Sequence, residues 1–124
     1  MDIKKATKLY RENSLMALPM RNLVLWLLEE VLKTLEKGKQ AMRVRDIAEQ
    51  NKQMKLSQQL IIEIIPLINS SLIEGEKLIV LTEYINRQLI LANITNDILI
   101  LEEAEEFILQ LRYAWRDVVE GKRE

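Results

Sequence analysis

The sequence contains no cysteine and no histidine, and each absence removes a class of chemistry. Without cysteine the chain forms no disulfide and offers no thiolate to a metal, which is typical of a cytosolic protein. Without histidine it lacks the commonest general base and the commonest metal ligand in proteins. The 3 glycines and 2 prolines leave few positions at which a helix must end. These absences favour long, uninterrupted elements without a catalytic centre.

Charge and hydropathy argue against two classes of partner. The formal net charge is −1, so the chain has no overall positive field that would attract nucleic acid. The longest apolar run, Leu23 to Leu28, is far shorter than the roughly 20 residues that span a bilayer. The residues after Met1 do not form the apolar run of a signal peptide. We expect a cytosolic protein that neither binds nucleic acid nor inserts into a membrane.

Sequence motifs for catalysis or cofactor binding are absent. The chain has no phosphate-binding glycine loop, no nucleophile elbow and no zinc-protease motif. A di-iron bundle uses Glu-x-x-His pairs, which a chain without histidine cannot supply. The acidic run between Glu102 and Glu106 is best interpreted as a solvated face that complements a helix dipole. We therefore predict no catalytic residue, no cofactor and no metal, and a function in binding.

The apolar residues follow a helical period over most of the chain. A first long helix is predicted from Pro19 to about Arg43, with proline in its first turn. Its main stripe consists of Leu23, Leu27, Val31, Leu35 and Met42. Further apolar residues surround its first half, namely Val24, Leu25, Trp26, Leu28 and Leu32. This surplus indicates either a central helix with several neighbours or an exposed groove for a partner, and the pattern does not separate the two.

A second helix is predicted to begin near Asp46, because Asp46 and Glu49 have the spacing of a capping box. Its first half, through Lys55, is polar and is expected to be exposed. Its second half is rich in isoleucine and leucine, and Pro66 is expected to kink it there. Gly38, inside the first helix, costs about 1 kcal/mol relative to alanine, and the close approach of a neighbour is one reason for it.

Two more helices are predicted after a connection marked by Asn69–Ser71 and Gly75. The stripe of the third is Leu78, Leu81, Ile85, Leu89 and Ala92. Residues 95–97 suit the N-cap of the fourth, which has a heptad seam of Leu101, Ala104, Ile108, Leu111, Trp115 and Val118. Four long helices with short connections predict an all-α fold, an up-and-down antiparallel four-helix bundle. We expect one domain over residues 1–124, with a short accessory N-terminal helix or arm at 1–17 and the bundle at 18–120.

Three segments resemble a known family in order and spacing. The first is Tyr10-Arg11-Glu12-Asn13-Ser14, followed by Leu18-Pro19 at the start of a leucine-rich helix. The second is Tyr84-Ile85-Asn86-Arg87-Gln88-Leu89-Ile90-Leu91-Ala92-Asn93, followed by Asn96-Asp97. The third is Arg112-Tyr113-Ala114-Trp115. Together they resemble the flagellar export chaperone FliS family from about Leu9 to Val119.

The resemblance implies an antiparallel bundle that binds newly made flagellin in the cytoplasm. In that family the chaperone holds the C-terminal segment of flagellin along apolar grooves, which prevents premature polymerisation and prepares the subunit for the type III export apparatus. The partner-binding residues expected on this basis are Tyr10, Asn13, Val24, Leu25, Leu28, Tyr84, Arg87 and Leu91. Components of the flagellar export gate are further expected partners.

The sequence departs from the family pattern at Leu28, Glu30, Thr82 and Leu91, all on the expected client face. A divergent paralogue with another client is therefore an alternative. In that interpretation the surplus apolar surface forms a homodimer, and the protein is a structural or regulatory binding protein.

Overall fold

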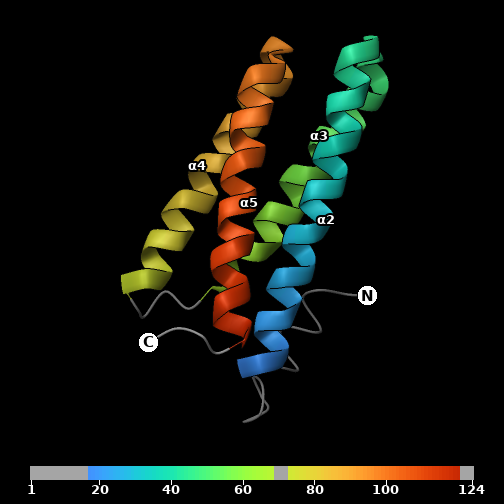
Figure 1. Cartoon of the computed structure of the whole chain (residues 1–124). Helices are drawn as coiled ribbons and strands as arrows, with labels where there is room; N and C mark the ends of the chain where they lie inside the picture. Colours follow the sequence, from blue (N-terminus) through green and yellow to red (C-terminus); the bar gives the residue numbers. More distant parts are fainter. Residues whose placement is uncertain (1–16, 69–72, 121–124) are drawn as a thin grey trace.

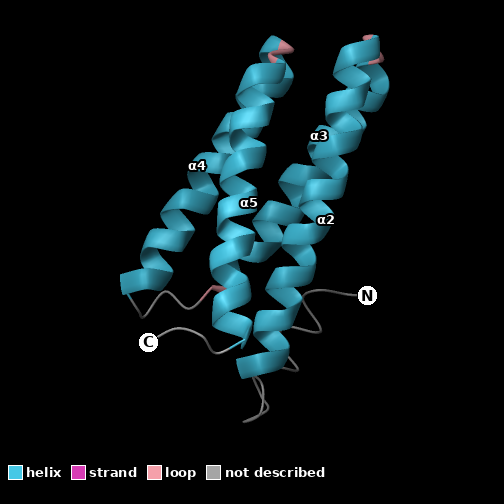
Figure 2. Ribbon diagram, viewed as in Figure 1, coloured by secondary structure: helices cyan, strands magenta, loops and turns pink. Residues whose placement is uncertain are grey.

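The computed structural model describes residues 17–68 and 73–120, without the side chains of residues 17–21, 73–74 and 117–120. The elements are α2 (Ala17–Val44), α3 (Ile47–Ile64), the short 3-10 helix η1 (Ile65–Leu67), α4 (Ile73–Thr95) and α5 (Ile98–Glu120). Within these ranges there is no strand (Figure 2). The predicted all-α fold is therefore confirmed, whereas the N-terminal arm, with Tyr10 and Asn13, lies outside the described residues.

The four long helices run alternately up and down, with the α2–α3 and α4–α5 turns at the same end (Figure 1). α2 packs against α3 and α5, and α4 packs against the same two helices from the other side. Each helix therefore has two neighbours and one outward face. This arrangement confirms the predicted antiparallel bundle.

The core lies along the bundle axis and contains most of the predicted stripes. The α5 seam is buried at every described position, namely Leu101, Ala104, Ile108, Leu111 and Trp115. On α2, Leu23, Leu27, Val31 and Leu35 are buried, and on α4, Ile85, Leu89 and Ala92 are buried. These patterns were predictable because each helix buries the one stripe that faces its neighbours.

The two turns at the same end of the bundle are built alike. Arg45 and Asn96 adopt positive φ angles of 60° and 54°, and each ends its helix in the left-handed conformation. The next residue then donates its backbone N–H back into the helix, from Asp46 to the Ala41 carbonyl at 2.9 Å and from Asp97 to the Ala92 carbonyl at 3.0 Å. A single residue thus reverses the chain at each turn.

The two aspartates of these turns also start the following helices. The Asp46 carboxylate accepts the Glu49 N–H at 3.1 Å, and Asp97 accepts the Leu99 N–H at 2.9 Å. Each satisfies a backbone donor that has no partner within the helix. The predicted starts near Asp46 and Asp97 are confirmed.

The prediction that the first half of α3 is exposed holds for Lys52 and Lys55 but was wrong for two glutamines. Gln50 and Gln53 are buried, and Gln50 is only 1% exposed. The Gln50 side-chain amide donates to the side-chain oxygens of Asn93 at 3.0 Å and Asn96 at 2.6 Å. These bonds join the α2–α3 hairpin to the α4–α5 turn. The amide is buried because partners more than 40 residues away in the sequence accept its hydrogens.

The predicted kink at Pro66 and the predicted connection at Gly75 both need correction. Pro66 does not kink a continuous helix, because α3 ends at Ile64 and Pro66 lies in η1. Gly75 lies inside α4 rather than in the connection before it, while Asn69–Ser71 are outside the described residues.

The expectation for Gly38 is confirmed. A Cβ atom added there would lie 3.1 Å from the sulfur of Met54, so α2 and α3 approach closely at this glycine.

Candidate functional site

Two of the predicted partner-binding residues on α2 are core residues. Val24 and Leu28 are each 1% exposed, and Leu25 is partly buried against the same core. The expectation that Val24 and Leu28 line an open groove is therefore corrected. The surplus of apolar residues in α2 arises because this helix packs against both α3 and α5, which is one of the two alternatives that the pattern left open.

Tyr84, Arg87 and Leu91 lie together on the outward side of α4. Adding Val80 and Ile94 extends this row in alternating steps of four and three residues, the spacing of a coiled-coil seam. We call these five residues the α4 seam. Val80, Leu91 and Ile94 are 63%, 42% and 74% exposed, and Ile90 beside them is also exposed. On a helical wheel the seam is opposite the buried row of Ile85, Leu89 and Ala92.

The outward faces of α2 and α5 are more polar than the α4 seam. The α2 face includes Lys33, Lys37 and Gln40, all of them exposed. The α5 face has exposed Glu103, Glu106 and Gln110 interspersed with exposed Leu99, Leu109 and Tyr113. Single exposed apolar residues such as Ile62 on α3 are ordinary at protein surfaces. Exposed apolar residues at heptad spacing suit the docking of a helix or an extended segment. The α4 seam is therefore the candidate binding site.

Tyr84 attaches one edge of the α4 seam to α5. Its ring meets the ring of Phe107 edge-on, with centroids 5.7 Å apart and an interplanar angle of 87°. This geometry is favourable for two aromatic rings. Tyr84 is half-buried, so part of its ring remains available beside Arg87 and Leu91.

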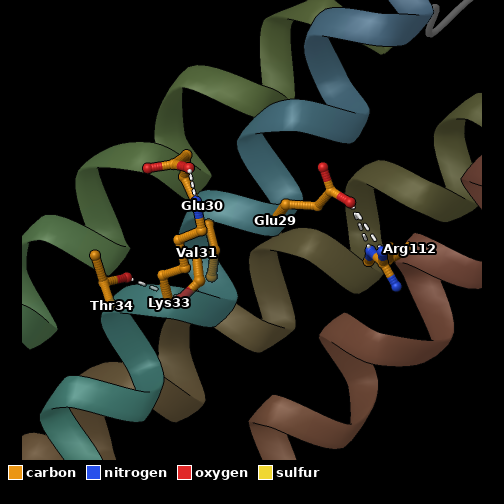
Figure 3. Close-up of polar contacts among 6 residues, drawn as sticks. All are labelled: Glu29, Glu30, Val31, Lys33, Thr34 and Arg112. Atoms are coloured by element: carbon orange, nitrogen blue, oxygen red, sulfur yellow. Dashed lines mark hydrogen bonds and ion pairs between the residues drawn. The ribbon is translucent and has the colours of Figure 1, made fainter.

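A second surface feature is an open depression between α2 and α5, with a volume of about 420 Å³. It is lined by Trp26, Glu29, Glu30, Leu32, Lys33 and Arg112. Figure 3 shows Glu29 of α2 directed toward Arg112 of α5, whose terminal nitrogen lies 2.8 Å from the carboxylate. Lys33 pairs with Glu30 at 3.0 Å. The charges of the depression thus neutralise one another, and the indole of Trp26, 47% exposed, is its main apolar contact surface.

Ion pairs continue along the α2–α5 contact. Lys39 is 9% exposed and donates to Glu105 at 2.7 Å, and Arg43 lies 3.8 Å from Glu102. The hydrogen bond to Glu105 raises the pKa of Lys39 above its ordinary value of 10.5. The acidic run of α5 therefore contacts the basic side of α2. The expectation that it complements the helix dipole was wrong, because the first turn of α5 contains no acidic residue.

The described residues include no group of three or more acidic side chains that could hold a metal ion. Within the same residues, no helix is long and apolar enough to cross a membrane.

The sequence analysis named Tyr84, Arg87 and Leu91, whose role in partner binding stays a prediction, and it did not name Val80, Ile94 or Trp26 as candidates. A helical wheel could have found Val80 and Ile94, because the predicted stripe of α4 already places them on the opposite side of the helix. Trp26 could have been found from the helical wheel of α2, where it shares a side with Asn22 and Lys33.

Comparisons with known proteins identify the family of this chain. A family model described as Flagellar protein FliS matches residues 3–122. The flagellar secretion chaperone FliS of Bacillus subtilis (strain 168) is 27% identical over 123 residues, which are 99% of this chain and 92% of that protein. The resemblance seen in the sequence is confirmed, and the chain belongs to the FliS family of flagellar proteins.

Proposed function

We propose that this protein is a cytosolic export chaperone for flagellin. It binds the C-terminal segment of flagellin, prevents premature polymerisation and delivers the subunit to the flagellar type III export apparatus. A chaperone role is supported by the family and by the name of the Bacillus relative. It is a role in binding, without catalysis.

The single observation that favours a segment-binding role is the α4 seam. A client segment that cannot bury its apolar residues alone can do so against Val80, Leu91 and Ile94. The buried apolar area offsets the entropy lost when the segment becomes ordered. Tyr84 and Arg87 provide an aromatic and a charged contact within the same row.

Titration calorimetry with the C-terminal peptide of the flagellin from the same organism tests the proposal. We expect a submicromolar dissociation constant for the wild type, a typical range for a specific interface of ordinary size. Leu28→Asp is unsuitable as a test because Leu28 is in the core. Leu91→Asp and Val80→Asp place the charge on the exposed seam, where the fold tolerates it.

Leu91→Asp should raise the dissociation constant at least about tenfold, which corresponds to a loss of roughly 1.4 kcal/mol. The matched control is Ile62→Asp, an exposed aliphatic residue on α3. Circular dichroism should give the same helix content for the three variants and the wild type. The proposal fails if the wild type shows no binding, or if Ile62→Asp weakens binding as much as Leu91→Asp does.

A further inference from the structure

One charged residue interrupts the α4 seam at its centre. Arg87 lies seven residues from Val80 and seven from Ile94, so it is two turns from either end of the row. A helix that covers the whole seam, roughly 21 Å long at 1.5 Å per residue, necessarily covers Arg87 as well.

Arg87 has no ion-pair partner among the residues that the structure describes. Glu83 is one turn earlier on α4, but no ion pair joins the two side chains. The guanidinium is exposed and therefore hydrated in the free protein. A partner helix removes that water, and burying an arginine is costly unless a carboxylate replaces the lost hydrogen bonds. The planar guanidinium fits a carboxylate with two parallel hydrogen bonds.

We propose that Arg87 determines the specificity of the α4 seam. It admits an amphipathic helical segment that presents a carboxylate at the middle of its apolar face, and it rejects faces that are apolar throughout. The inference rests on the proposed function only where the acidic segment is taken to be that of flagellin.

The same residue disfavours pairing of the α4 seam with that of a second copy of this chain. The α4 seam of another copy offers Val80, Tyr84, Leu91 and Ile94 as apolar contacts, and its one charged group is again Arg87. When two α4 seams pair, the Arg87 side chain of each copy meets no carboxylate within the seam of the other copy. If the two seams are aligned at their centres, the two Arg87 cations face each other. The chain thus keeps an exposed apolar row without pairing α4 to α4.

The first experiment measures oligomeric state by sedimentation equilibrium up to several hundred micromolar. The wild type should remain monomeric, and Arg87→Leu should form a dimer with a dissociation constant at least about tenfold below that of any wild-type self-association. The matched control is Lys52→Leu, which also introduces leucine in place of an exposed cation, but on α3. It should behave as the wild type does. A wild-type dimer abolished by Leu91→Asp, or an Arg87→Leu variant as monomeric as the wild type, would overturn the proposal.

The second experiment uses two designed amphipathic helical peptides that differ only at the centre of the apolar face, one with glutamate and one with glutamine. The wild type should bind the glutamate peptide at least about tenfold more tightly, since hydrogen bonds to charged groups contribute more than neutral ones. Arg87→Gln should remove that preference, and Arg87→Glu should reverse it. Equal affinities for the wild type would overturn the proposal.

The two proposals fail in distinguishable ways. If the designed peptides show the preference but the flagellin peptide does not bind, the proposed client is wrong and the role of Arg87 stands. If flagellin binds as tightly to Arg87→Gln as to the wild type, the role of Arg87 is wrong and the client stands.

Discussion

Gln50 provides the sharpest test of how the two helical hairpins are joined. Its side-chain nitrogen lies 3.0 Å from the Asn93 oxygen and 2.6 Å from the Asn96 oxygen. Gln50→Leu keeps the approximate volume and removes both hydrogen bonds. Gln50→Glu keeps the shape but replaces the donor with an acceptor that faces other acceptors. The two variants therefore separate lost hydrogen bonding from electrostatic conflict.

The magnitudes follow from the burial of Gln50. Two hydrogen bonds contribute about 1 kcal/mol each in net terms, so Gln50→Leu should lower the free energy of unfolding by about 1–2 kcal/mol. At pH 7.5 Gln50→Glu also places a buried carboxylate against the acceptor oxygens of Asn93 and Asn96, which raises the expected loss to about 3–5 kcal/mol. Both values are large relative to the 5–15 kcal/mol stability of a typical domain.

The Gln50→Glu variant should also depend on pH with a definite sign. Burial beside acceptor oxygens raises the pKa of the introduced carboxyl in the folded state above its unfolded value of about 4.3. The loss in the free energy of unfolding, relative to the wild type, is therefore smallest below the unfolded pKa. This loss grows as the pH rises through the folded pKa. Comparing variant and wild type at the same pH cancels the titration of other groups.

Urea unfolding followed by circular dichroism at pH 7.5 and pH 5 measures these differences. Gln59→Glu, an exposed position on the same helix, is the matched control and should change the free energy of unfolding by no more than about 0.5 kcal/mol. A loss below 0.5 kcal/mol for Gln50→Glu at pH 7.5, or a deficit that shrinks as the pH rises, would refute the reasoning.

Three other substitutions test the turns, the glycine contact and the α2–α5 ion pairs. Arg45→Gly should raise the free energy of unfolding by about 0.5–1 kcal/mol in urea titrations, because glycine adopts the positive φ of 60° without strain; a lower midpoint would contradict this. Gly38→Val should lower it by about 1–3 kcal/mol, since the new side chain meets a buried side chain of α3, whereas Lys37→Val, exposed beside it, should cost less than 1 kcal/mol. The raised pKa of Lys39 means that its pairing with Glu105 stabilises the fold below about pH 10.5 and is lost as the pH rises through the folded pKa. Lys39→Met should therefore reduce the fall in melting temperature between pH 9 and pH 11, and an unchanged fall would exclude this account.

The seam of α5 shows what local pattern predicts well. Residues Leu101, Ala104, Ile108 and Leu111 repeat at the period of the helix, and the same period determines which side is buried. The helix starts at Asp46 and Asp97 were predictable for a similar reason, because a cap is formed by residues two or three positions apart. These features depend on near neighbours in the chain.

Gln50 and Val24 show where the pattern was insufficient. A glutamine in a polar stretch is predicted to be exposed. Gln50 is buried because Asn93 and Asn96, which belong to the other hairpin, accept hydrogen bonds from its side chain. The apolar pattern of α2 is equally consistent with Val24 in the core and with Val24 in a binding groove. Its burial was decided by the position of α2 between α3 and α5.

The sequence by itself determined the helical class, the helix starts at Asp46 and Asp97, the bundle and the family, because periodicity, caps and motifs are properties of residues close in the chain. The tertiary structure decided which apolar residues remain at the surface. α2 has the longest apolar row but buries it between two neighbours, whereas α4 buries one side and exposes Val80, Leu91 and Ile94 on the other. The candidate binding surface therefore lies on α4, since exposure depends on which helices are adjacent and not on how apolar a helix is.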